Sequence, residues 1–135
     1  MRILFLSRDG GGRSQMAAAL AGELFGGEAD CFAAGIEPSA PHPLAVETMR
    51  EAGLDLATTT PLTDLDTMRL DLVVVVSERD VSVGRVPKTV KRVHWPIMDP
   101  LDPPAPEKEL RERFRDTRMA LSKHLKGLGK IKRKL

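Results

Sequence analysis

The 135-residue sequence contains a single cysteine, Cys31. An internal disulfide, a Cys-x-x-Cys redox pair and a cysteine-based metal site each need at least two thiols, so all of them are excluded. The three histidines, His42, His94 and His124, lack the short spacings that hold a metal ion. We therefore expect neither a bound metal nor another cofactor.

Long apolar runs are also missing. No stretch approaches the roughly 20 apolar residues that a membrane-spanning helix needs. The N-terminus runs directly into a strand-like segment and lacks the pattern of a signal peptide. The length suits one hydrophobic core. We predict a single cytoplasmic domain over residues 1–128, followed by a basic tail over residues 129–135.

Aromatic residues make up only 4% of the chain, and tyrosine is absent. This scarcity bears on the C-terminal end, where residues 123–135 hold six of the 21 Lys and Arg and no acidic residue. Clustered cations can bind nucleic acid phosphates, but no Phe, Trp or Tyr is interleaved here to stack on bases. A solvated tail explains this pattern, nucleic acid is not expected as a partner, and a protein partner remains open.

Short apolar runs alternate along the chain with segments of helical periodicity. Predicted strands cover residues 3–6, 30–34, 72–76 and 92–95, and predicted helices cover residues 14–25, 44–52 and 107–128. The run of four valines in 72–76 is typical of a central parallel strand that is buried on both faces. The order of elements predicts an α/β three-layer sandwich around a central, mainly parallel four-stranded sheet.

A glycine-rich segment joins the first predicted strand to the first predicted helix. Its members are Ser7, Arg8, Asp9, Gly10, Gly11, Gly12, Arg13 and Ser14. Glycines let backbone N–H groups converge, the following helix offers its N-terminal N–H groups, and the arginine can add a guanidinium fork. The segment follows the carboxyl end of a strand, where ligands of α/β sheets bind. We predict an oxyanion-binding loop.

Two familiar phosphate-binding motifs do not fit this segment. Arg13 stands where a Walker A loop needs lysine, and Gln15 stands where a dinucleotide fingerprint needs its third glycine.

The segment resembles the loop of the low-molecular-weight protein tyrosine phosphatase superfamily, which includes the thioredoxin-coupled arsenate reductases. That loop reads Cys-x5-Arg-Ser, and here Ser7 falls on the cysteine, Arg13 on the arginine and Ser14 on the serine. Further similarity extends to about Leu125. It includes Gln15-Met16-Ala17, Ala33 to Pro38, Pro43 to Asp55, His94-Trp95 and Asp99-Pro100. The resemblance implies a phosphotyrosine protein phosphatase I-like fold.

The resemblance also implies roles for Ser7, Arg13 and Asp99 as the catalytic positions. In the family a thiolate attacks phosphorus or arsenic, the arginine and backbone N–H groups hold the transition-state charge, and the aspartate protonates the leaving oxygen. A serine hydroxyl is not ionised as a cysteine thiol is, so Ser7 would need a general base. The loop contains no histidine, although His42 or His94 could approach it.

The arsenate reductase mechanism needs three cysteines that pass electrons along, and this chain has only one. The three redox cysteines of the reductases fall on Ser7, on Ser77 and near Gly84, and Cys31 matches none of them. Asp9, Gly10 and Gly12 depart from the family loop as well, which indicates divergence of the whole loop rather than a single exchange at position 7.

Three hypotheses follow for the function. The first is a catalytically impaired protein of this fold that binds a small oxyanion or a phosphorylated ligand as a binding or regulatory module. The second is a weak phosphomonoesterase or tyrosine phosphatase-type hydrolase that uses Ser7, with Asp99 as the acid. The third is an interaction scaffold with an empty loop.

Overall fold

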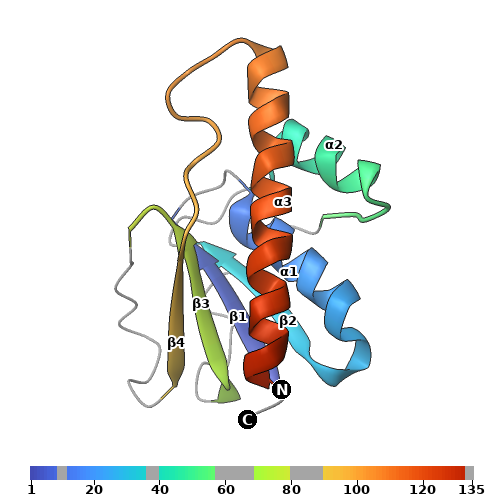
Figure 1. Ribbon diagram of the computed structural model, residues 1–135, viewed down its shortest axis with the longest axis vertical. Coiled ribbons are helices and arrows are strands. Elements are labelled where there is room, and N and C mark those ends of the chain that lie inside the picture. The colour runs from blue at the N-terminus through green and yellow to red at the C-terminus, as the bar shows by residue number, and fades with distance from the viewer. Residues whose placement is uncertain (9–11, 36–39, 57–68, 80–89, 133–135) are drawn as a thin grey trace.

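The computed structural model describes residues 1–8, 12–35, 40–56, 69–79 and 90–132 (Figure 1). The chain alternates between strands and helices, as the sequence predicts. The strands are β1 (Arg2–Ser7), β2 (Asp30–Gly35), β3 (Leu72–Ser77) and β4 (Lys91–Pro96). The helices are α1 (Arg13–Phe25), α2 (Pro43–Glu51) and α3 (Glu107–Lys132), with a short 3-10 turn, η1 (Gly26–Glu28), after α1.

The four strands form one sheet in the order β2-β1-β3-β4, and every neighbouring pair is parallel. The predicted fold class is thus confirmed, with a sheet that is parallel throughout. Because all strands run the same way, their carboxyl ends lie at one edge, where Ser7 is in register with Gly35 and Ser77 with Pro96. The glycine-rich segment that begins at Ser7 leaves the sheet at this edge.

Both central strands are buried on their two faces. On one face Ile3, Phe5 and Val74 belong to the same core cluster as residues of α1 and α3. On the other face Leu4 and Val75 belong to a second, smaller cluster. Figure 1 shows α3 crossing in front of the sheet, with α1 beside it. Because successive side chains point to opposite faces and both faces are covered, residues 3–6 of β1 and 72–76 of β3 are all apolar.

The helix boundaries differ slightly from those predicted. The C-terminal helix runs to Lys132, so the predicted end at Leu128 is wrong by four residues. No proline interrupts residues 129–132, so every backbone N–H of this segment can donate within the helix, which continues into the basic segment. Residues 133–135 of the predicted tail lie outside the described part of the chain.

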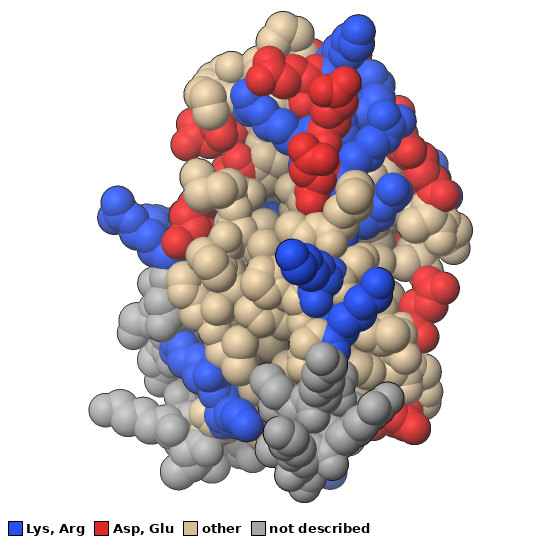
Figure 2. Space-filling view, in the orientation of Figure 1, with Lys and Arg blue, Asp and Glu red and all other residues tan. Residues whose placement is uncertain are grey.

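Charged side chains of both signs gather over the first half of α3, as Figure 2 shows at the upper end of that face. Three of the arginines there, Arg111, Arg113 and Arg115, form ion pairs with glutamates of α2 or of α3 itself. Among the described helices, none is long and apolar enough to cross a membrane.

Candidate functional site

A pair of serines joins the end of β1 to the start of α1. Ser7 is the last residue of β1 and is fully buried, and its Oγ donates a hydrogen bond to Oγ of Ser14 at 2.9 Å. Ser14 is the second residue of α1 and is also fully buried. The first N–H groups of a helix have no partner within the helix and carry its positive dipole end. The serine pair thus lies at an anion-favouring end of α1.

Gly12 makes the turn into α1. It is the N-cap residue, with φ of 96° and ψ of 0°, and its carbonyl accepts a hydrogen bond from the Met16 N–H at 2.8 Å. A Cβ at this position would lie 2.9 Å from the Cβ of Ala45 in α2. The turn therefore requires glycine for its left-handed backbone and also for its close packing against α2.

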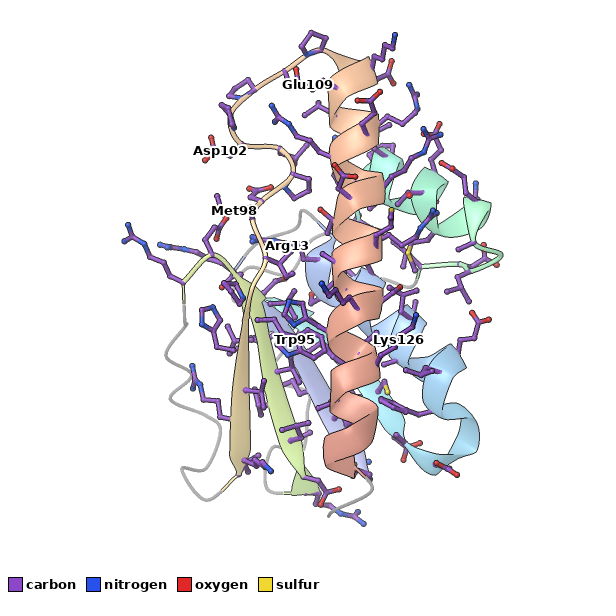
Figure 3. The ribbon with its side chains drawn as sticks, in the orientation of Figure 1. Arg13, Trp95, Met98, Asp102, Glu109 and Lys126 are labelled. Atoms are coloured by element: carbon purple, nitrogen blue, oxygen red, sulfur yellow. The ribbon has the colours of Figure 1, made fainter. Side chains whose placement is uncertain are left out.

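Arg13, the first residue of α1, is only 1% exposed and is among the largest fully buried side chains. Its Nη1 donates to the carbonyl of Ile97 at 2.8 Å and lies 3.2 Å from Oε1 of Glu78. Figure 3 shows Arg13 beside the segment that carries Met98, at the carboxyl end of the sheet. One guanidinium thus connects the start of α1, the end of β3 and the segment after β4.

Glu78 links this arginine to Asp99. The same atom that faces Arg13, Oε1 of Glu78, accepts the backbone N–H of Asp99 at 3.1 Å. Burial acts to raise the pKa of Glu78, but its own backbone N–H, the Arg13 charge and the Asp99 N–H together lower the pKa below its ordinary value. The carboxyl group is therefore ionised at neutral pH.

Asp99 itself begins a turn. Its Oδ1 accepts the backbone N–H of Leu101 at 2.9 Å, which is the geometry of an Asx turn, and its carbonyl accepts the Asp102 N–H at 3.1 Å. One carboxylate oxygen thus fixes the shape of the proline-rich segment that follows β4. The role of Asp99 as an acid stays a prediction.

The structure brings together four of the predicted loop residues and leaves others apart. Ser7, Gly12, Arg13 and Ser14 meet at the junction of β1 and α1, whereas Arg8 is exposed. Asp9, Gly10 and Gly11 lie outside the described residues. The binding role of the whole set stays a prediction.

Sequence reasoning missed Glu78 and the carbonyl of Ile97. Glu78 directly follows the buried valine strand, and the carboxyl end of that strand adjoins the end of β1. The rule that ligands bind at the carboxyl ends of parallel strands could have directed attention to it. The Ile97 carbonyl carries no side-chain signal, because any residue type offers the same backbone oxygen.

The two histidines that could have supplied a base have structural partners. His42 caps α2 by accepting the Leu44 N–H on Nδ1 at 3.1 Å, and its ring stacks on Phe114 with centroids 5.2 Å apart. His94 lies in β4, with Nε2 at 2.9 Å from the carbonyl oxygen of Ser77. These contacts explain both residues without a part in proton transfer.

Cys31 lies at the opposite end of the sheet from the serine pair. It is in register with Ile3, whereas Ser7 is in register with Gly35, four residues further along β2. At about 3.3 Å per residue, the separation along the strand is roughly 13 Å. Among the described residues, no group of His, Cys, Asp or Glu has an arrangement that could hold a metal ion.

Comparison with known proteins identifies the family. The profile of the low molecular weight phosphotyrosine protein phosphatases matches residues 2–134. The chain belongs to this family. The match confirms membership of the family that the sequence resembles, and it spans the segment that contains Arg13 and Ser14.

Relatives in the low molecular weight phosphatase family include arsenate reductases. An arsenate reductase of Staphylococcus aureus (strain Newman) is 33% identical over 105 residues, which cover 76% of this chain and 80% of the relative. A solved structure described as an arsenate reductase in the phosphate binding state has a TM-score of 0.78 at 25% identity, covering 94% of this chain and 95% of the other.

A third relative concerns the nucleophile position of the phosphatase fold. It is a cysteine-to-serine mutant of the YwlE arginine phosphatase with a phosphorylated active-site serine. Its TM-score is 0.71 at 27% identity, and the match covers 96% of this chain and 94% of the other.

Proposed function

We propose that this member of the low molecular weight phosphatase family binds a small oxyanion or a phosphorylated ligand and acts as a binding or regulatory module without thiol catalysis. The observation that carries this proposal is the buried guanidinium of Arg13 at the start of α1, beside the Ser7–Ser14 hydroxyl pair. A helix N-terminus with an adjacent arginine favours a bound anion. The related structure described as being in the phosphate binding state supports the same ligand class.

The absence of thiol catalysis follows from where the hydroxyl and the thiol lie. Ser7 ends β1 beside Arg13, whereas the thiol of Cys31 belongs to the other end of the sheet. A helix N-terminus and a guanidinium can lower a cysteine pKa from about 8.5 to below neutrality, but a serine hydroxyl has no accessible ionised form there. Reduction of arsenate through an internal disulfide is excluded, because the chain holds one cysteine.

Oxyanion binding is tested by thermal denaturation with sulfate, phosphate and arsenate at constant ionic strength. Each anion should raise the Tm of the native protein, since a ligand at 100 times its Kd stabilises a fold by about 2.7 kcal/mol. Arg13→Lys should raise the apparent Kd for each anion about tenfold or more, and so should reduce the Tm shift at a given anion concentration. The reason is that lysine keeps the charge but loses the planar fork.

The matched control is Arg118→Lys. Arg118 also donates to a backbone carbonyl, that of Thr48, and it lies on α3 away from the loop. It should leave the anion-induced shift unchanged. If none of the three anions moves the Tm of the native protein, the binding proposal is wrong and the interaction scaffold gains support.

The inactive nucleophile is tested by Ser7→Cys. Installing a thiol close to Arg13 should create turnover of a chromogenic aryl phosphate, because a thiolate is a competent nucleophile and the guanidinium can stabilise the charge of the transition state. The native protein should show no turnover above the Ser7→Ala variant. Turnover by the native protein that disappears in both Ser7→Ala and Arg13→Lys would contradict the non-catalytic proposal.

A second candidate function is phosphoryl transfer to Ser7. The YwlE mutant with a phosphorylated active-site serine favours this candidate, because its fold carries a serine that accepts a phosphoryl group. In this step a bond forms between Ser7 Oγ and phosphorus and the ester bond of the donor breaks. A protonated Asp99 gives its proton to the leaving oxygen, which departs as an alcohol, and the serine proton passes to solvent water, from which Asp99 is reprotonated. The serine alkoxide is a poorer leaving group than a cysteine thiolate, so the phosphoserine product would hydrolyse slowly.

Mass spectrometry after incubation with an aryl phosphate separates the two candidates. Phosphoryl transfer predicts that the peptide containing Ser7 gains the mass of HPO₃, and that this gain is absent in Ser7→Ala. An unmodified peptide together with an anion-induced Tm shift supports binding alone.

A further inference from the structure

Glu78 holds the position of an anion ligand on Arg13. Its Oε1 accepts from two donors at once, the guanidinium Nη1 at 3.2 Å and the Asp99 backbone N–H at 3.1 Å. An arginine nitrogen together with a backbone N–H is the kind of donor pair that binds phosphate or sulfate oxygens. The carboxylate thus satisfies, within the chain, a donor set that also suits an oxyanion.

The two partners of this ion pair differ in their exposure to solvent. Arg13 is 1% exposed and depends on protein groups to balance its charge, whereas Glu78 is 35% exposed and borders solvent. Glu78 lies just past the end of β3, outside the regular strand. Its side chain can therefore turn toward water when a bound anion takes over the balance of the guanidinium charge.

A second negative charge near the same guanidinium interacts unfavourably with this carboxylate. The coulombic energy between Glu78 and a bound anion is proportional to the charge of the anion, whether the carboxylate stays or moves aside. A doubly charged oxyanion is penalised about twice as much as a singly charged one of the same shape. Glu78 therefore affects which anions bind as well as how tightly they bind.

We propose that Glu78 is a specificity-determining residue of the oxyanion site: it competes with the ligand for Arg13 and selects singly charged over doubly charged tetrahedral oxyanions. This inference rests on the proposed function, since it requires that the site binds anions. It assigns Glu78 a role that the loop motif does not contain.

Displacement of Glu78 also has a consequence for the segment after β4. The Asp99 N–H loses its acceptor when the carboxylate leaves, and the Asp99 side chain shapes the turn through Leu101. A bound oxyanion that accepts the same N–H replaces the lost hydrogen bond. Ligand exchange at Arg13 is in this way coupled to the position of Asp99.

The test compares sulfate and perchlorate, which are both tetrahedral but carry two charges and one. Their Kd values are measured by calorimetry at constant ionic strength for the native protein, Glu78→Gln and Glu78→Ala. Glutamine is nearly isosteric and keeps an acceptor for the Asp99 N–H, and alanine gives a second neutral variant. We expect the Kd for sulfate to fall about tenfold and that for perchlorate about threefold in each variant, in line with ligand charge.

Glu51→Gln is the matched control. Glu51 pairs with Arg115 at 3.1 Å and is 36% exposed, so it resembles Glu78 in both respects but lies on α2. It should leave both Kd values unchanged. An equal improvement in Glu51→Gln would reveal a general effect of net charge and would overturn the inference.

The remaining outcomes are distinguishable from one another. Equal gains for sulfate and perchlorate in the Glu78 variants overturn the charge selection. Unchanged Kd values in those variants, with anions bound by the native protein, overturn the inference and leave the proposed function intact. If neither the native protein nor the Glu78 variants bind sulfate or perchlorate, the proposed function itself fails and the inference fails with it.

Discussion

Gly12 shows how one residue can be fixed by two independent constraints. Its φ of 96° is a left-handed conformation, which places a strain on any residue with a Cβ. Its Cα also approaches α2 so closely that an added Cβ would lie 2.9 Å from the Ala45 Cβ. The sequence predicted a glycine-rich turn here for anion binding, and the structure adds a packing reason for this particular glycine.

Gly12→Ala should lower the free energy of unfolding by at least about 1–2 kcal/mol, the cost of the left-handed conformation alone. Gly127→Ala is the control, because Gly127 lies within α3 and an added Cβ would meet nothing within 4 Å. It should raise the free energy of unfolding by about 0.5–1 kcal/mol through better helix propensity. Urea denaturation measures both, and a neutral or stabilising Gly12→Ala would contradict the argument.

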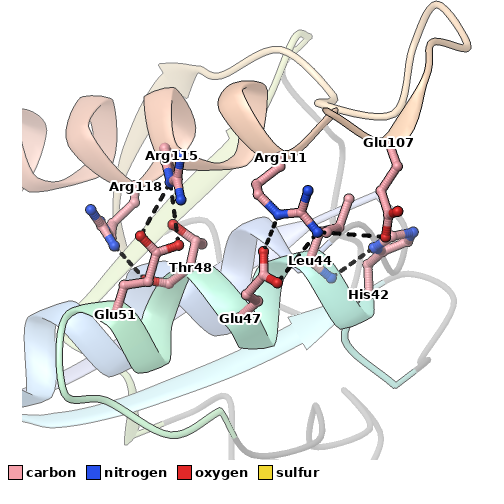
Figure 4. A network of polar contacts seen from close by, with 9 residues as sticks. All are labelled: His42, Leu44, Glu47, Thr48, Glu51, Glu107, Arg111, Arg115 and Arg118. Carbon is pink, nitrogen blue, oxygen red and sulfur yellow. Dashed lines mark hydrogen bonds and ion pairs between the residues drawn. The ribbon is translucent and has the colours of Figure 1, made fainter. Parts of the chain in front are cut away.

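At the scale of elements, α2 and α3 are held together by two kinds of contact. Figure 4 shows a ladder of ion pairs in which Arg111 contacts Glu47 at 2.6 Å and, one turn further, Arg115 contacts Glu51 at 3.1 Å. The four-residue spacing on both helices aligns the two rungs. Beneath the ladder, Phe114 is fully buried against the His42 ring.

The buried contact should contribute far more than the ladder. Phe114→Ala should lower the free energy of unfolding by about 3–5 kcal/mol, since it removes a buried ring and leaves a cavity. Glu47→Gln should have a much smaller effect that fades further with added salt, because exposed ion pairs are screened by water and ions. Chemical denaturation at low and high salt measures the difference, and comparable losses in the two variants would refute it.

At the scale of the whole molecule, three side chains in the described part of the chain have a pKa in the folded protein below their ordinary value. Hydrogen bonding to Arg111 lowers the pKa of Glu47 despite some desolvation, and burial followed by the nearby Lys123 charge lowers the pKa of His124. With Glu78, these groups bind protons less readily in the folded protein than in the unfolded chain. Stability conferred at neutral pH should therefore be lost as the pH falls.

His124→Gln isolates one part of this pH dependence. The unfolded chain takes up a proton on His124 near pH 6.5, whereas the folded protein does so only at lower pH, so stability drops as the pH falls through that window. The variant should lose less stability than the native protein between about pH 8 and about pH 5. Urea denaturation across this range measures it, and parallel pH profiles would contradict the assignment.

Trp95 provides an independent optical signal. It is the only tryptophan of the chain, and its ring stacks on His124 with centroids 5.1 Å apart. Its fluorescence should follow protonation of His124, with a midpoint below the ordinary histidine value. The same titration in His124→Gln should be flat.

Much of the fold could be predicted from the sequence because local patterns reflect the sheet directly. The four-valine run predicted a buried central strand, and residues 72–77 form one. The leucine and phenylalanine spacing of 107–128 predicted a one-sided helix, and Phe114 and Leu121 are fully buried. The end of that helix could not be predicted, because glycine and lysine are compatible with both a helix and a tail.

The sequence by itself determined the membership of the family and predicted an oxyanion-binding loop with Ser7, Arg13 and Ser14, because motif spacing and residue type are properties of the chain alone. Only the tertiary structure decided what Arg13 contacts, since Glu78 directly follows β3 and Ile97 directly follows β4, both far from Arg13 in sequence. Parallel pairing brings the ends of β1, β3 and β4 to one edge. The partners of a buried charge depend on that convergence, and no local pattern encodes it.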